Sequence, residues 1–197
     1  MESHEQASQG QALEHHGSQL IVLVGAPGSD TDKIGARLSE VLHRDWLFTD
    51  DVIQHLVGMS IEDVDVTEHG LTRTLEHDAT QAVLSDVDAM QERIVVLGSA
   101  SLGQSVNDSD FADIQARVRA LGQAGAYVIY CWAHAEELIK RSGIAGPRLA
   151  AVFPPRKILR SQFPERDALY RSVATHDVNI VGKSVDECTT EIQRLIA

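Results

Sequence analysis

The stretch Leu20-Ile21-Val22-Leu23-Val24-Gly25-Ala26-Pro27-Gly28-Ser29-Asp30-Thr31-Asp32 decides the fold of this chain. Its first five residues form an unbroken apolar run, which is typical of a buried strand. Residues 33–43, which follow the loop, have the apolar spacing of a helix. A strand, a glycine-containing loop and a helix in this order are the setting of a phosphate-binding P-loop. The stretch therefore predicts an α/β domain with an anion site at the start of this helix.

The residues that hold phosphate in such a loop are replaced here. The motif is Gly-x-x-x-x-Gly-Lys-Ser/Thr; Gly25 fits its first position and Gly28 lies inside it. Asp30, Thr31 and Asp32 stand where the second glycine, the lysine and the magnesium-binding hydroxyl belong. At about 4 Å and an effective dielectric of about 20, two like charges repel by ~4 kcal/mol, whereas an anion gains ~0.3–1 kcal/mol at a helix N-terminus. We therefore expect Asp30 and Asp32 to cap the helix, so that the loop fills its own anion site.

Lys33 is the nearest candidate for a displaced P-loop lysine. It lies two residues beyond the usual position, which is about 200° around the helix axis. We expect its side chain to point away from the phosphates unless the loop is reshaped.

The length and composition of the chain indicate one globular domain. It has 197 residues, of which 43% are hydrophobic, enough for a core. The formal net charge of −12 argues against a general nucleic-acid binder, which needs a basic surface. No apolar run approaches the roughly 20 residues that span a bilayer, so we expect no membrane partner and a cytoplasmic location. Residues 1–18 are polar and lack the apolar segment of a secretory signal, which predicts a disordered tail before a domain at 19–197.

The two cysteines, Cys131 and Cys188, lie in a predicted strand and a predicted helix, without the spacing of metal ligands. We expect both to be buried, reduced thiols. The sequence predicts no metal site.

Further apolar runs and helical patterns alternate along the chain. The short apolar runs that predict strands are 46–48, 94–97, 127–131 and 178–181. The clearest helical patterns are 71–84, 113–121, 136–141 and 185–196. Apolar strands that alternate with helices favour a parallel sheet covered by helices on both faces.

Two segments interrupt this alternation. Residues 58–76 are a helical excursion between the second and third strands. Residues 143–155 contain Gly143, Gly146, Pro147, Pro154 and Pro155. This composition suits a mobile lid over a site, and a plain surface loop is the alternative.

Three dispersed motifs lie beyond the loop. They are Gly58-Met59-Ser60-Ile61, Arg73-x-x-Glu76 and Glu165-Arg166-x-Ala168-Leu169-Tyr170-Arg171. With their spacing they resemble the shikimate kinase family, from about residue 20 to the C-terminus. The resemblance implies a three-layer P-loop kinase fold with a five-stranded parallel sheet, a substrate-binding segment at 58–76 and a lid at 143–155. Active members of the family use magnesium and move the γ-phosphate of ATP to the 3-hydroxyl of shikimate, in aromatic amino-acid biosynthesis.

The resemblance implies that the substrate half of the site is largely kept. Phe48-Thr49-Asp50 matches the family's Asp-Thr-Asp, so Asp50 would face the shikimate hydroxyls and is the candidate base for the 3-hydroxyl proton. The family's first aspartate organises magnesium, which Phe48 cannot do. Without the resemblance, Asp50 is interpreted as a helix N-cap. The family's three-glycine turn becomes Gly98-Ser99-Ala100, in which only Gly98 is kept.

Arg73, Glu76 and Arg166 match the family's carboxylate-binding residues. By themselves, Arg73 and Glu76 lie one helical turn apart and predict a surface ion pair that adds little stability. The resemblance implies instead that Arg73 binds the shikimate carboxylate and that Glu76 fixes Arg73. It also makes Arg166 a second carboxylate-binding arginine, suited to planar, bidentate recognition.

Two further basic residues match nucleotide-side segments of the family. Arg148, in Pro147-Arg148-Leu149, lies within one residue of the expected lid arginine, within reach of a bound ligand. Lys183, in a Gly-Lys-Ser turn, resembles the segment that borders adenine, although a solvated turn residue is the favoured interpretation.

Three functional hypotheses follow from the sequence. The leading one is a pseudoenzyme that keeps the shikimate pocket and needs no cofactor, because its P-loop no longer grips ATP. It would bind shikimate or a similar small carboxylic acid, and act as a regulator or as the partner of an active kinase. The second hypothesis is an active shikimate kinase that uses ATP and magnesium with Lys33 and Arg148 as unorthodox cations. The third is a scaffold protein that binds no ligand.

Overall fold

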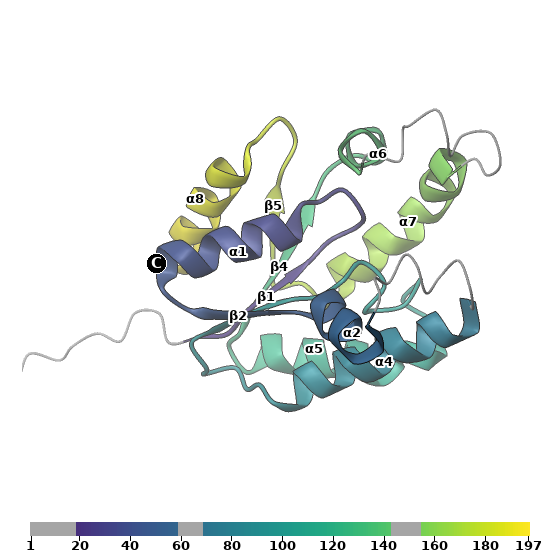
Figure 1. Ribbon diagram of the computed structural model, residues 1–197. Helices are drawn as coiled ribbons and strands as arrows, with labels where there is room; N and C mark the ends of the chain where they lie inside the picture. The colour runs from purple at the N-terminus through teal and green to yellow at the C-terminus, as the bar shows by residue number, and fades with distance from the viewer. Residues whose placement is uncertain (1–18, 59–68, 143–154) are drawn as a thin grey trace, which may run out of the picture.

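The computed structural model describes residues 19–58, 69–142 and 155–197 (Figure 1). Three expectations fall wholly or mostly outside these ranges: the disordered tail at 1–18, the first half of the substrate-binding segment and the lid with Arg148. They remain predictions.

Five parallel strands form a single sheet in the order β2-β3-β1-β4-β5, which confirms the predicted fold class. The strands are β1 (Ile21–Val24), β2 (Asp45–Phe48), β3 (Arg93–Val96), β4 (Tyr127–Trp132) and β5 (His176–Asn179). The central strand β1 is buried along its whole length. Its unbroken apolar sequence follows from this position, because helices cover both faces of the sheet.

The helices lie on both sides of the sheet, as Figure 1 shows, with α1 and α8 on one side and α4 and α5 on the other. They are α1 (Thr31–Leu42), α2 (Thr49–Val57), α4 (His69–Ser85), α5 (Ala112–Gln123), α6 (Ala135–Arg141), α7 (Pro155–Val173) and α8 (Val185–Ile196), with a short 3₁₀ turn η1 (Ser109–Phe111) before α5. Helix α1 approaches the sheet closely through Gly35, where an added Cβ would lie 2.3 Å from Val96 Cγ2. The P-loop helix is therefore held firmly against β3.

Two elements differ from the sequence prediction. Strand β5 begins at His176 rather than Val178, because an edge strand exposes its first residues and need not be apolar there. Helix α7 was not predicted, because prolines stand at its start and inside it. Pro155 occupies its first residue, where a helix needs no N–H, and Pro164 is accommodated in the interior.

Both cysteines are buried and unlinked, so their predicted burial is confirmed. Burial raises the pKa of the Cys131 thiol well above its ordinary value. In the part of the chain that the structure describes, no helix is both long enough and apolar enough to cross a membrane.

Candidate functional site

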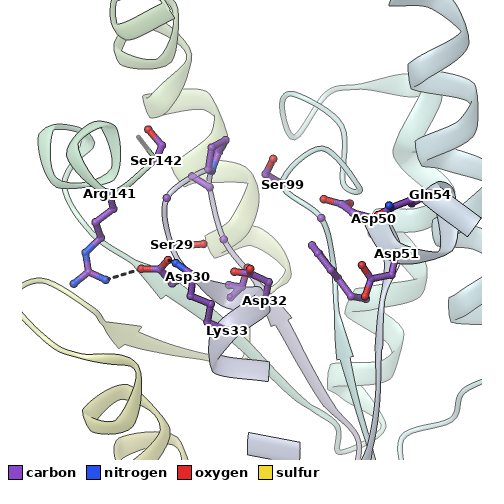
Figure 2. A pocket seen from close by; sticks show the side chains of 17 residues that line it. Ser29, Asp30, Asp32, Lys33, Asp50, Asp51, Gln54, Ser99, Arg141 and Ser142 are labelled. Carbon is purple, nitrogen blue, oxygen red and sulfur yellow. Dashed lines mark hydrogen bonds and ion pairs between the residues drawn. The ribbon is translucent and has the colours of Figure 1, made fainter. Parts of the chain in front are cut away.

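A cavity of about 470 Å³ lies at the carboxyl ends of β1, β2 and β3. Such an edge is where open parallel sheets bind ligands. Figure 2 shows the loop residues Asp30, Asp32 and Lys33 on one side of this cavity and Asp50, Asp51 and Gln54 of α2 on the other. The structure thus brings the P-loop and the start of α2 to one site.

The glycines of the loop are required by its geometry. Gly28 has φ +87°, and an added Cβ would lie 2.3 Å from the carbonyl oxygen of Leu138. At Gly25, an added Cβ would lie 2.4 Å from Ser29 Oγ. The observed path of the loop therefore requires glycine at both positions.

Asp30 occupies the N-cap position of α1 in the left-handed region, with φ 55°, but its side chain caps no backbone N–H. Its carboxylate instead accepts hydrogen bonds from Lys33 Nζ at 2.5 Å and from Arg141 Nη1 at 3.2 Å (Figure 2). The expectation that Asp30 caps the helix is wrong for this reason, while Asp32 does lie in the first turn. The carboxylate is neutralised by cations rather than by the helix terminus.

Arg141, at the end of α6, links the loop to the turn between β5 and α8. Its guanidinium also donates to Glu137 Oε1 at 3.0 Å and to the carbonyl oxygens of Ile180 and Lys183, each at 2.8 Å. The Arg141 and Asp30 side chains are each only 18% exposed, so the ion pair is shielded from solvent. Sequence reasoning missed Arg141, because its partners are distant in the chain.

Both lysines considered in the sequence analysis form ion pairs with carboxylates. Lys33 is among the residues that line the cavity, its ammonium is bonded to Asp30, and this hydrogen bond raises the pKa of Lys33. Lys183 is not simply a solvated turn residue, since its ammonium pairs with Glu191 of α8.

Asp50 lies in the first turn of α2, one residue after a fully buried threonine. Thr49 Oγ1 accepts a hydrogen bond from the Gly98 N–H at 2.7 Å and contacts Ser101 Oγ at 3.0 Å. An added Cβ at Gly98 would lie 1.9 Å from Asp50 Oδ1, so this glycine allows the carboxylate to pack against the end of β3. The N-cap position of α2 is held by Phe48 and not by Asp50, which corrects the N-cap interpretation.

Arg166 is attached to the wall of the cavity at Ser99. Arg166 Nη1 and the Tyr170 hydroxyl both donate to the Ser99 carbonyl oxygen, at 2.9 and 2.7 Å. Tyr170 is buried and stacks on Tyr130 with ring centroids 5.2 Å apart. Burial raises the pKa of Tyr170, so its hydroxyl stays protonated and acts as the donor.

Arg73, on α4, contacts two carboxylates that the sequence reasoning did not single out. Its Nη2 donates to Asp108 Oδ1 at 2.9 Å and to Asp110 Oδ2 at 3.1 Å, and its guanidinium lies 5.1 Å from the centroid of the Phe111 ring. Glu76 follows one turn later on the same helix and is half-buried. Of the predicted substrate-binding residues in the described part of the chain, Asp50 and Gly98 line the cavity, whereas Arg73, Glu76 and Arg166 lie outside its lining.

Comparison with known proteins identifies the family. The model of the shikimate kinase family matches residues 28–197. The chain is 33% identical to the shikimate kinase of Streptomyces coelicolor over 171 residues, which cover 86% of this chain and 91% of that protein. This chain belongs to the shikimate kinase family. It is also 34% identical to the shikimate kinase of Mycobacterium tuberculosis over 166 residues, covering 80% of this chain and 82% of that one.

Solved shikimate kinases share the fold. A structure of the Acinetobacter baumannii shikimate kinase in complex with shikimate superposes with a TM-score of 0.72 at 23% identity, covering 92% of this chain and 94% of that chain. The shikimate kinase from Aquifex aeolicus gives a TM-score of 0.65 at 19% identity, with 89% of this chain covered and 94% of that chain. These likenesses show the architecture.

Within this shikimate kinase fold, the loop residues do not fit a magnesium–triphosphate group. The cations that line the described cavity, Lys33 and Arg141, are both bonded to Asp30. Thr31, at the lysine position, is buried and uncharged, and Asp32 adds a second negative charge. Among the described residues, no group of three or more His, Cys, Asp or Glu side chains is placed to hold a metal ion.

Proposed function

We propose that this shikimate kinase family member binds shikimate, or a similar small carboxylic acid, and does not transfer phosphate from ATP. The observation that carries the proposal is the Asp30 carboxylate bonded to both Lys33 and Arg141 at the P-loop. A protein of this kind acts as a small-molecule binder, as a regulator or as the partner of an active kinase. The buried free thiols Cys131 and Cys188 suit a reducing cytoplasmic location.

The proposal for the nucleotide side rests on charge. A triphosphate in the loop would compete with Asp30 for Lys33 and Arg141 and would face Asp32 as well. At about 4 Å, the repulsion between a phosphate and a carboxylate exceeds the attraction of a helix N-terminus for the phosphate. We infer that the protein does not bind ATP and for this reason does not transfer phosphate.

The proposal for the substrate side rests on the groups around Asp50. Thr49 and Gly98 support this carboxylate, which is suited to accept hydrogen bonds from ligand hydroxyls. Arg166, fixed at Ser99, would contribute to binding the ligand carboxylate together with Arg73, with Glu76 as a positioning residue. These roles follow the family pattern.

A thermal-shift experiment tests both halves together. The melting temperature is measured with shikimate, with magnesium-ATP and with both, on this protein and on Asp30→Gly/Thr31→Lys/Asp32→Ser. We expect shikimate to stabilise both proteins and magnesium-ATP to stabilise only the triple variant; at 100 times Kd, a ligand adds ~2.7 kcal/mol. Micromolar binding of magnesium-ATP to the unaltered protein in calorimetry would reject the proposal.

A second candidate function is an active kinase that transfers phosphate from ATP to shikimate. It is favoured by Lys33 and Arg141 lining the cavity, and by the relatives, which bear the name shikimate kinase. Here magnesium and ATP would be required and Asp50 would act as the base. A coupled assay decides: turnover that Lys33→Ala abolishes would establish this function. If shikimate raises the melting temperature of neither the unaltered protein nor the triple variant, a scaffold role without a ligand is favoured instead.

A further inference from the structure

The loop between β3 and α5 carries two acidic residues that face Arg73. Asp108 contacts the Arg73 guanidinium through both of its oxygens, at 2.9 and 3.2 Å, and Asp110 adds a contact at 3.1 Å. The Asp108 side chain is only 12% exposed, whereas that of Asp110 is 72% exposed. The guanidinium that the family pattern assigns to a ligand carboxylate is therefore already bonded to carboxylates of the chain.

The loop itself helps to hold Asp108 in place. Asp108 Oδ2 accepts a hydrogen bond from the Gln104 N–H at 2.9 Å. At Gly103, with φ +83°, an added Cβ would lie 2.6 Å from the same oxygen. The Gln115 side chain of α5 holds the loop by donating to the carbonyl oxygens of Leu102 and Ser105. Arg73 therefore meets a pre-positioned acceptor.

Asp108 also remains ionised at neutral pH. Burial acts to raise the pKa of this carboxyl, but the Gln104 N–H and the Arg73 guanidinium outweigh burial and lower it. A ligand carboxylate would have to displace an anion that is held in place by backbone hydrogen bonds.

We infer that Asp108 and Asp110 determine ligand specificity, because by occupying Arg73 they weaken the preference of the site for ligands that carry a carboxylate. The inference rests on the proposed function, in which Arg73 contacts the ligand carboxylate. A charged ligand then gains less over an uncharged one of the same shape, since Arg73 is neutralised in both cases and Arg166 alone is left to favour the ligand carboxylate. Hydroxyl recognition at Asp50 is unaffected.

Calorimetry with shikimate and with its uncharged methyl ester tests this inference. Asp108→Asn keeps an acceptor for the Gln104 N–H and removes the charge, and Asp110→Asn removes a single exposed contact. We expect the ratio of the two affinities to shift toward shikimate by about 5-fold in Asp108→Asn, which corresponds to ~1 kcal/mol, and by less in Asp110→Asn.

Asp113→Asn is the matched control. Asp113 lies in the first turn of α5 and pairs with His77, which is on α4 like Arg73, so the variant changes the net charge equally without releasing Arg73. It should leave the ratio unchanged. Equal ratios in the unaltered protein, Asp108→Asn and Asp113→Asn would overturn the inference while leaving shikimate binding, and so the proposed function, intact.

A second measurement separates the two proposals if no protein binds shikimate. Arginine modification by phenylglyoxal, located by peptide mass spectrometry, reports whether Arg73 has been released. The missing binding then rejects shikimate as the ligand, whereas faster modification of Arg73 in Asp108→Asn than in Asp113→Asn would still support the occupation of Arg73 by Asp108. An unchanged rate would overturn the inference as well.

Discussion

The P-loop and the start of α2 face one cavity, but they differ in how their acidic side chains are held. In the P-loop, Gly25 and Gly28 fit the path of the backbone, and the cations Lys33 and Arg141 are bonded to the Asp30 carboxylate. The start of α2 keeps a buried polar support, in which Thr49 bonds to Gly98 beneath Asp50. The difference teaches that the backbone of a loop and the side chains it carries are under separate control, because the backbone path depends on sterics and packing.

The largest expected effect comes from removing the support of α2. Thr49→Val deprives the Gly98 N–H and Ser101 Oγ of a buried partner, so we expect unfolding to become easier by about 2–3 kcal/mol. Urea denaturation measures the change. Thr190→Val, at an exposed threonine of α8, should cost less than about 0.5 kcal/mol. Equal losses in the two variants would remove the basis for the comparison.

A smaller effect on stability, with a large one on ligand binding, is expected at Gly98. Gly98→Ala places a methyl group 1.9 Å from Asp50 Oδ1, which must move, at a cost of about 1–2 kcal/mol. Under the proposed function, shikimate would then no longer raise the melting temperature. Gly35→Ala creates a similar clash with Val96 and should lower stability while the shikimate response persists. If shikimate still raises the melting temperature of Gly98→Ala, Asp50 does not take part in binding the ligand.

The ion pair at the P-loop should contribute less. A double-mutant cycle of Asp30→Asn and Arg141→Met is expected to give a coupling energy of about 1 kcal/mol, because both side chains are largely shielded. The exposed pair of Glu136 and Arg160 is the control, with an expected coupling of about 0.3 kcal/mol or less. If the coupling energy between Asp30 and Arg141 is as small as that of the control pair, Arg141 is easily released from the Asp30 carboxylate. This result would favour the active-kinase function.

The smallest expected effect depends on pH, at His77. A hydrogen bond to Asp78 raises the pKa of His77, with burial opposing and Asp113 adding to the rise. The folded protein then binds the proton more tightly, so the stabilisation is full below pH 6.5 and is lost as the pH rises through the folded-state pKa. We expect at most about 0.5 kcal/mol, because solvent screens this pair.

Melting temperatures between pH 6 and pH 8, roughly the range in which a histidine titrates, measure this effect. His77→Gln should lose less stability than the unaltered protein as the pH rises, and Asp113→Asn should give an intermediate slope. Identical slopes in all three proteins would assign the pH dependence to other groups.

Much of the fold was predictable from local pattern. The apolar runs located all five strands to within about two residues, and the helix at 185–196 was predicted with its observed bounds. The exceptions have physical causes: β5 is an exposed edge, and the prolines of α7 occupy tolerated positions. The candidate site was predictable only in part. Its acidic loop and Lys33 are visible in the sequence, but Arg141, the second cation bonded to Asp30, is not.

The sequence by itself determined the sheet, the replaced P-loop and the family, because these depend on residue type and on spacing along the chain. Only the tertiary structure decided which charges meet. Asp30 and Arg141 are 111 residues apart, Thr49 and Gly98 are 49 apart, and Arg73 and Asp108 are 35 apart. Since electrostatic and hydrogen-bond partners depend on distance in space, the packing of α4, α6 and the β3–α5 loop around the sheet set the charge of each end of the site.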